Sequence, residues 1–167
     1  FKDKEGKIFA DNDERMLFFC KGVLETLIML GWKPDIVHCH GWITSMLPMY
    51  LKTKYSADSI FSSTHIITSL YNQSFLGSLN KKLREKILQD DQIEDKLELL
   101  NKTNCLGLYK HAAKFSDAII FNKGFGKINE IKDVVKKDVE IMGNGKEELT
   151  LEEYESFYNH SLMLETA

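Results

Sequence analysis

Two histidines that alternate along a short apolar segment are the residues best placed to do chemistry. His38 and His40 follow Ile36 and Val37, and this pattern predicts a buried strand over residues 36 to 39. Alternate side chains of a strand leave on the same face, so both imidazoles should share one surface. Such a pair can hold a metal ion or exchange hydrogen bonds with a ligand. No neighbouring cysteine or carboxylate supplies a convincing third ligand, and we predict no metal.

A polar turn follows this strand, at the place where α/β proteins bind ligands. Gly41 and Trp42 lead into an amphipathic segment that predicts a helix over residues 44 to 54, with Pro48 near its first turn. In open α/β sheets the ligand crevice lies beyond the carboxyl ends of the strands. The turn after His40 is therefore the candidate functional site.

Strands and helices alternate along the rest of the chain. Further strands are predicted over residues 65–70 and 117–121, and helices over residues 12–30, 79–100 (one or two, with a solvated charged face), 106–115, 128–136 and 151–164. Capping boxes are expected at Asp11 with Glu14 and at Thr150 with Glu153. Alternation of this kind requires parallel strands joined by right-handed crossovers. The sequence predicts a three-layer, Rossmann-like α/β domain with a parallel sheet.

Polar residues also follow the second and third predicted strands. Tyr71, Asn72 and Gln73 come after one of them, and Asn122 after the other. The carboxyl ends of parallel strands meet at one edge, so we expect these side chains on the same rim as His40. Asn72 can serve as an adaptable amide ligand or simply as a turn-former.

The composition of the chain indicates a globular domain and argues against nucleic-acid binding and membrane insertion. The chain has 167 residues, 43% hydrophobic content and a formal charge of −3, which suits one domain with a real core. Its lysines and arginines form no basic stripe, so we expect no nucleic-acid partner. Lys21 and Glu25 interrupt the apolar run of residues 18–30, so no membrane span is expected. An odd number of widely spaced cysteines, three in all, favours a reducing cytoplasm.

The central segment resembles a known family of glucosyltransferases. Residues 32–42 read WKPDIVHCHGW, and the bacterial glycogen synthase and plant starch synthase family carries W-x-P-D-[IV]-[IVL]-H-x-H-D-W in its N-terminal domain. The likeness continues through residues 11–15, 66–77 and 109–118, and is looser at 58–63 and after about residue 138. On this resemblance, residues 1–167 are a single incomplete N-terminal domain, half of a two-domain B-type glycosyltransferase fold.

The resemblance implies a reaction and a set of partners. Enzymes of this family transfer glucose from ADP-glucose to the non-reducing end of an α-1,4-glucan with retention of configuration, and no further cofactor is implied. Their K-x-G-G-L phosphate loop and the C-terminal domain that supplies Arg, Lys and a carboxylate are not found in these residues. The isolated chain is therefore expected to be inactive, with a nucleotide sugar, an α-1,4-glucan and a missing or separate C-terminal domain as its partners.

The resemblance also assigns site residues, with departures from the family pattern. His40 and Tyr71 are the candidate catalytic residues, although Tyr71 stands where the family has His in T-[IV]-H-N. The candidate substrate-binding residues are His38, Gly41, Trp42, Asn72 and Gln73. Gly41 stands where the family has Asp, and residues 121–124 replace its T-V-S-P loop. Replacing Gly41 by Asp together with Tyr71 by His is expected to raise transfer in a weakened enzyme.

Other interpretations of the same residues stay open. The chain can be a glucan-binding or regulatory module without chemistry, or a nucleotide-binding Rossmann module, for which Gly124-x-Gly126 is a weak signal. One of the two histidines can be a satisfied, partly buried residue that holds the loop. Trp32 and Trp42 can stack on sugar rings, but packing in the core is the commoner role.

Overall fold

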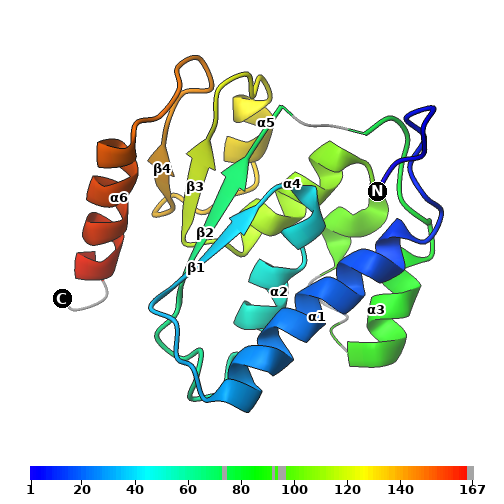
Figure 1. Cartoon of the computed structure of the whole chain (residues 1–167), viewed down its shortest axis with the longest axis horizontal. Helices are drawn as coiled ribbons and strands as arrows, with labels where there is room; N and C mark the ends of the chain where they lie inside the picture. The colour runs from blue at the N-terminus through cyan, green and yellow to red at the C-terminus, as the bar shows by residue number, and fades with distance from the viewer. Residues whose placement is uncertain (73–74, 92, 94–96, 165–167) are drawn as a thin grey trace.

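A parallel four-stranded sheet forms the centre of the structure (Figure 1). The computed structural model describes residues 1–72, 75–91, 93 and 97–164. The strands, side by side in chain order, are β1 (Ile36–His40), β2 (His65–Leu70), β3 (Ala118–Phe121) and β4 (Glu140–Met142). The helices are α1 (Asn12–Leu30), α2 (Leu47–Lys52), α3 (Leu83–Asp91), α4 (Cys105–Lys114), α5 (Ile128–Lys132) and α6 (Leu151–Leu164), with 3-10 turns η1 (Trp42–Thr44) and η3 (Glu98–Asn101).

All the strand pairs are parallel, as predicted from the alternation of elements. His40 pairs with Ser69 across β1 and β2, and Leu70 pairs with Phe121 across β2 and β3. The three carboxyl ends therefore lie at one edge of the sheet. Strand β4 was not predicted, because it has only three residues and Ile141 remains partly exposed.

Helices cover both faces of the sheet, which confirms the predicted layers. Ile66 and Ile119 face the main core, where α1, α2 and α4 pack. Ile67 and Ile120 face the opposite way and meet Phe157 of α6 in a smaller cluster. Figure 1 shows α6 beyond β4, away from the other helices. α6 is thus the cover of the second face.

Helix termini follow local sequence signals in two cases and depart from them in one. α1 ends at Gly31, whose φ of 62° allows its N–H to bond the carbonyls of Ile28 and Leu27. At the start of α6, Thr150 N donates to Glu153 Oε2 at 2.7 Å and Glu153 N donates to Thr150 Oγ1 at 3.2 Å, the predicted capping box. The box predicted at Asp11 is wrong, because the carboxylate of Asp11 accepts a bond from Arg15 and makes no cap.

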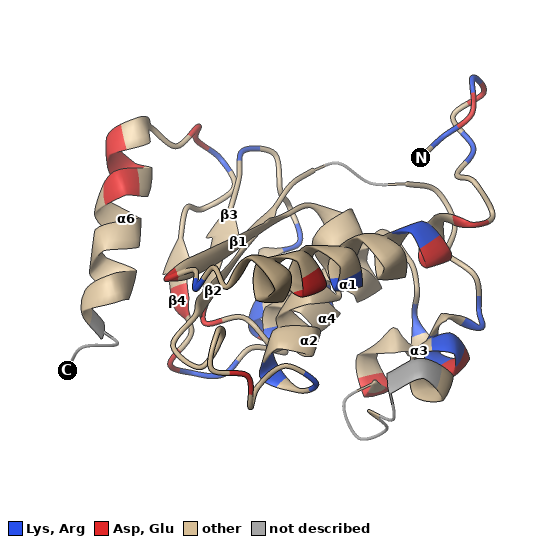
Figure 2. Cartoon of the chain, turned by 60° about the horizontal axis from the view of Figure 1, so that its bottom comes forward, with Lys and Arg blue, Asp and Glu red and all other residues tan. Residues whose placement is uncertain are grey.

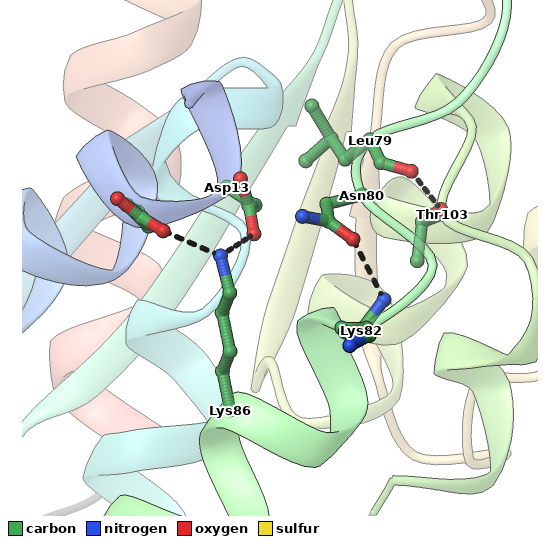
Figure 3. Close-up of polar contacts among 7 residues, drawn as sticks. Asp13, Leu79, Asn80, Lys82, Lys86 and Thr103 are labelled. Carbon is green, nitrogen blue, oxygen red and sulfur yellow. Dashed lines mark hydrogen bonds and ion pairs between the residues drawn. The ribbon is translucent and has the colours of Figure 1, made fainter. Parts of the chain in front are cut away.

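One lysine ties α3 to the beginning of α1. Lys86 Nζ lies 2.7 Å from Asp13 Oδ2 and 2.6 Å from Glu14 Oε1 (Figure 3). The hydrogen bond to Asp13 is the main cause of the raised pKa of Lys86. The side chain of Asp13 is fully buried, and a buried carboxylate without a partner would be costly. Lys86 therefore departs from the solvated face expected for residues 79–100.

Charges of both signs are spread over the surface (Figure 2). The first turn of α6 carries Glu152 and Glu153, which suit the positive end of a helix dipole.

Cys20, Cys39 and Cys105 are buried and free. Within the described part of the chain, no helix combines the length and the apolar character needed to cross a membrane.

Gly107, in the first turn of α4, generates a stability prediction. A Cβ at this position would overlap the backbone carbonyl oxygen of Lys102. We expect Gly107→Ala to lower the free energy of unfolding by about 1–3 kcal/mol, the range for overpacked sites. Gly22 in α1 has open space around its Cβ position, so Gly22→Ala is the control and should be neutral or stabilising. Urea unfolding measures both; equal stabilities for the two variants would contradict the account.

Candidate functional site

The predicted site residues that the structure describes gather at the carboxyl edge of the sheet. His40 ends β1, Tyr71 and Asn72 follow β2, and Asn122 follows β3. Backbone bonds extend the ladder into these loops, since Gly41 N donates to Ser69 O at 3.3 Å and Asn122 N donates to Leu70 O at 3.1 Å. Gln73 lies outside the described residues. The parallel register thus brings three separate loops together.

His40 is paired with the tyrosine from the neighbouring loop. Its Nδ1 lies 2.7 Å from the hydroxyl of Tyr71. Because a phenol is the stronger hydrogen-bond donor, Tyr71 donates to Nδ1 of a neutral imidazole, and the ring proton then lies on Nε2 as a donor. Although the residue as a whole is exposed, desolvation by the groups packed against its ring lowers the pKa of His40 and so favours the neutral ring. The exposed His40 therefore offers a neutral hydrogen-bond donor at the rim.

His38 has a partner on each ring nitrogen. Nδ1 lies 2.6 Å from the hydroxyl of Tyr158, and Nε2 lies 2.8 Å from Ser69 Oγ. The ring also contacts the ring of His40 in a tilted arrangement, with centroids 3.9 Å apart and an interplanar angle of 36°. Burial, and secondarily the proximity of His40, lowers the pKa of His38 to about 3. His38 is thus a neutral, satisfied residue that holds the loop, one of the two roles open from sequence.

Two tyrosines of α6 belong to the same cluster. The hydroxyl of Tyr158 meets His38, and the hydroxyl of Tyr154 donates to Asn122 Oδ1 at 2.8 Å. They stand four residues apart and so share one face of the helix. Sequence reasoning missed them, although the Tyr-x-x-x-Tyr spacing after a capping box was visible. Nothing in that spacing says which part of the sheet the helix covers.

The two tryptophans have different surroundings. Trp42 in η1 meets Phe75 edge-on at 5.0 Å and Phe1 edge-on at 5.4 Å between ring centroids. Its ring is held among aromatic neighbours, as the packing interpretation expects. Trp32 is 62% exposed, so the expectation that it packs in the core is wrong.

The loops after β2 and β3 touch at a glycine. A Cβ on Gly124 would lie 3.2 Å from the Cβ of Asn72, and the φ of Gly124 is 85°. A glycine is therefore needed for both backbone conformation and close approach. The following helix α5 has only five residues. Gly124 thus has a structural explanation that does not require a dinucleotide.

The cluster is built from groups without formal charge. It contains two imidazoles, three phenols, a serine hydroxyl and two amides. Groups of this kind exchange hydrogen bonds with neutral hydroxyls. Among the residues that the structure describes, no group of three or more His, Cys, Asp or Glu could hold a metal ion.

The sequence of the chain is similar to starch synthases and glycogen synthases. A family model described as the starch synthase catalytic domain matches residues 1–122. A glycogen synthase of Chlorobium limicola is 45% identical over 80 residues, which are 48% of this chain and 16% of that protein. One of Chlorobaculum parvum is 33% identical over 106 residues, 64% of this chain and 21% of that protein. The chain thus matches a small part of the length of these relatives.

A solved structure supports the same fold. The catalytic domain of starch synthase IV from Arabidopsis thaliana, bound to ADP and acarbose, superimposes with a TM-score of 0.55 and 19% identity. The match covers 81% of this chain and 30% of that one. At this identity the likeness concerns the fold alone.

The lowered pKa of His38 generates a prediction on pH. Folding lowers the pKa of His38 from 6.5 to about 3, so between these pH values the unfolded state binds a proton that the folded state does not. The free energy of unfolding is therefore highest above pH 6.5 and decreases as the pH falls toward 3. Between pH 7 and 5 a fully linked site would lose at most about 2 kcal/mol.

We expect His38→Gln, which cannot titrate, to flatten part of this slope in urea unfolding at several pH values. His111 is fully buried and its pKa is also lowered to about 3 by burial, so it should account for a remaining slope. An unchanged slope in His38→Gln would refute the role of His38.

The backbone at Gly41 generates a second prediction. Gly41 has φ 72° and ψ −178°, a region that is essentially restricted to glycine. Its Cβ position is open, so strain rather than a clash opposes a side chain. We expect Gly41→Asp to lower the free energy of unfolding by about 1–3 kcal/mol. The paired change with Tyr71→His, suggested by sequence, would carry the same strain. Calorimetry of Gly41→Asp checks this, and wild-type stability would contradict it.

Proposed function

Because the chain belongs to the starch synthase catalytic domain family, we propose that it forms part of a glycosyltransferase that moves glucose from ADP-glucose to an α-1,4-glucan with retention of configuration. The observation that carries the proposal is the neutral donor rim at the carboxyl edge of the sheet. The solved starch synthase IV was bound to ADP and acarbose, a nucleotide and a sugar-like ligand. We propose ligands of the same chemical classes for the whole protein to which this chain belongs.

The rim suits the sugar part of such a substrate. His40, held by Tyr71 at 2.7 Å, offers an Nε2–H donor, and Asn72 is exposed beside it in the next loop. Fixed donors stabilise a transition state because they need no reorganisation when charge develops. Desolvation lowers the pKa of His40, and a neutral imidazole suits orientation of a hydroxyl better than proton transfer by a charged group. The role proposed for this rim is to bind and orient sugar hydroxyls.

The diphosphate leaving group requires cations from elsewhere. Transfer from a nucleotide sugar releases a diphosphate, whose developing charge is stabilised by Arg, Lys or metal ions. Lys123, the cation nearest to the rim in sequence, is largely exposed and lies 3.8 Å from Glu148. We propose that other parts of the full protein supply the phosphate-binding groups, and that the isolated chain is inactive.

A second candidate function is supported by one specific contact. Tyr71 replaces the histidine expected from the family, and its hydroxyl is bonded to His40 rather than left free. A phenol engaged in this way can support sugar binding without the catalytic geometry. The alternative is therefore a glucan-binding or regulatory module that has lost the chemistry.

Assays on the full-length gene product separate the two functions. We expect labelled glucose from ADP-glucose to enter glycogen, and His40→Ala to reduce this transfer by about a hundredfold, as for loss of a fixed transition-state donor. Tyr55 bonds Glu25, and Tyr55→Phe is the matched control, which should keep full activity. Glycogen binding without transfer would favour the second candidate, and absence of both would exclude the two.

A further inference from the structure

Helix α6 lies outside the residues matched by the family model, yet it reaches the candidate site. The match ends at residue 122, whereas Tyr154 and Tyr158 contact Asn122 and His38. We propose that α6 completes the site, with Tyr158 and Tyr154 as positioning residues that fix the contacting pair His38 and His40 and the side chain of Asn122. The proposal rests on the proposed function for its ligand, but its geometry can be tested separately.

The hydrogen bonds around His38 have a definite direction. A phenol is a stronger acid than an aliphatic hydroxyl, so Tyr158 donates to His38 Nδ1, and the Nε2–H then donates to Ser69 Oγ. Tyr154 makes a separate contact, because its hydroxyl donates to Asn122 Oδ1. The two phenols of α6 thus bind the polar residues of β1 and of the loop after β3.

This direction selects one tautomer of His38. With Nδ1 as acceptor and Nε2 as donor, the ring is held from both sides in one orientation. The ring of His40 lies against that ring with a centroid distance of 3.9 Å, so the orientation of His38 limits the orientation of His40. Tyr158 therefore acts on the Nε2–H donor of His40 through two rings. It does not need to touch a ligand to do so.

Ser69 and Asn122 are both held in place by their surroundings. Ser69 is fully buried, and a buried hydroxyl without partners is costly. Asn122 is held from two sides, because its Nδ2 lies 3.4 Å from Leu70 O while its Oδ1 accepts from Tyr154. The phenols of α6 thus supply hydrogen-bond partners to His38 on β1 and to Asn122 in the loop after β3.

Conservative changes in α6 should leave the fold intact. α6 is anchored separately by Phe157, which packs on Ile67 and Ile120, and by Ser161, which donates to Glu140 Oε2 at 2.8 Å. A Tyr→Phe change at position 158 keeps the ring and removes only the hydroxyl. Effects of such a variant can therefore be assigned to the hydrogen bond.

The test compares Tyr158→Phe and Tyr154→Phe with the remote control Tyr55→Phe in the full-length gene product. Histidine labelled with ¹⁵N reports the tautomer of His38, which His38→Gln identifies in the spectrum. We expect wild type and Tyr55→Phe to show the Nε2–H tautomer alone, and Tyr158→Phe to show a mixture. Binding of maltoheptaose should weaken by about threefold to tenfold in Tyr158→Phe, the equivalent of one hydrogen bond.

The outcomes distinguish this proposal from the proposed function. An unchanged His38 tautomer in Tyr158→Phe overturns the positioning role, whatever the binding data show. A mixed tautomer in a protein that binds no maltoheptaose even as wild type supports the positioning role and contradicts the glucan site. A mixed tautomer with unchanged maltoheptaose binding overturns the claim that α6 completes the site. Tyr154→Phe should weaken binding of maltoheptaose but change the tautomer of His38 less than Tyr158→Phe does, because Tyr154 bonds Asn122 and not His38.

Discussion

Parallel pairing of β1, β2 and β3 is the constraint on which the site depends. His40, Tyr71 and Asn122 are far apart in the chain, and only the shared direction of the three strands brings them to one edge. The register matters as much as the direction. A slip by one residue would send His38 and His40 to the opposite face of the sheet, into the main core. The apolar residues that alternate on β2 therefore fix the site as well as the core.

The chemistry of the site follows from the burial of His38 among uncharged polar groups. Burial makes the charged form of His38 unfavourable, and each of its ring nitrogens has a partner. A fully partnered neutral network is stable in such surroundings, whereas an isolated charge would not be. The site is thus suited to orienting uncharged hydroxyls. Binding of a diphosphate calls for groups of a different kind.

Local signals explain what could be predicted from sequence. β1, β2 and β3 are short apolar runs followed by polar residues, so strands, direction and rim could all be inferred. Gly31 marks the end of α1 in the sequence, and the capping box of Thr150 and Glu153 marks the start of α6. The capping box at Asp11 failed because Arg15, one turn later, competes for the same carboxylate. Such competition depends on side-chain geometry that the motif does not contain.

Long-range placement explains what could not be predicted. The sequence of residues 151–164 does not indicate that Tyr158 contacts His38, 120 residues earlier in the chain. Helix periodicity predicts which residues share a face, but not which element that face packs against. β4 is too short and too exposed to leave a pattern. Trp32 looked like a core residue by its type, yet it follows the helix end at Gly31 and stays exposed. These features depend on tertiary packing, which overrides local preference.

Two of the departures from the family pattern at the rim, Gly41 and Tyr71, are connected through His40. Gly41 follows His40 directly and adopts a backbone conformation restricted to glycine, while Tyr71 bonds the ring of His40. Both changes therefore act on the orientation of the same imidazole. A histidine at position 71 would remove the phenol that donates to Nδ1, and an aspartate at position 41 would strain the turn that begins there. Substitutions at positions 41 and 71 are therefore expected to be coupled, so the effect of each must be measured in the presence of the other.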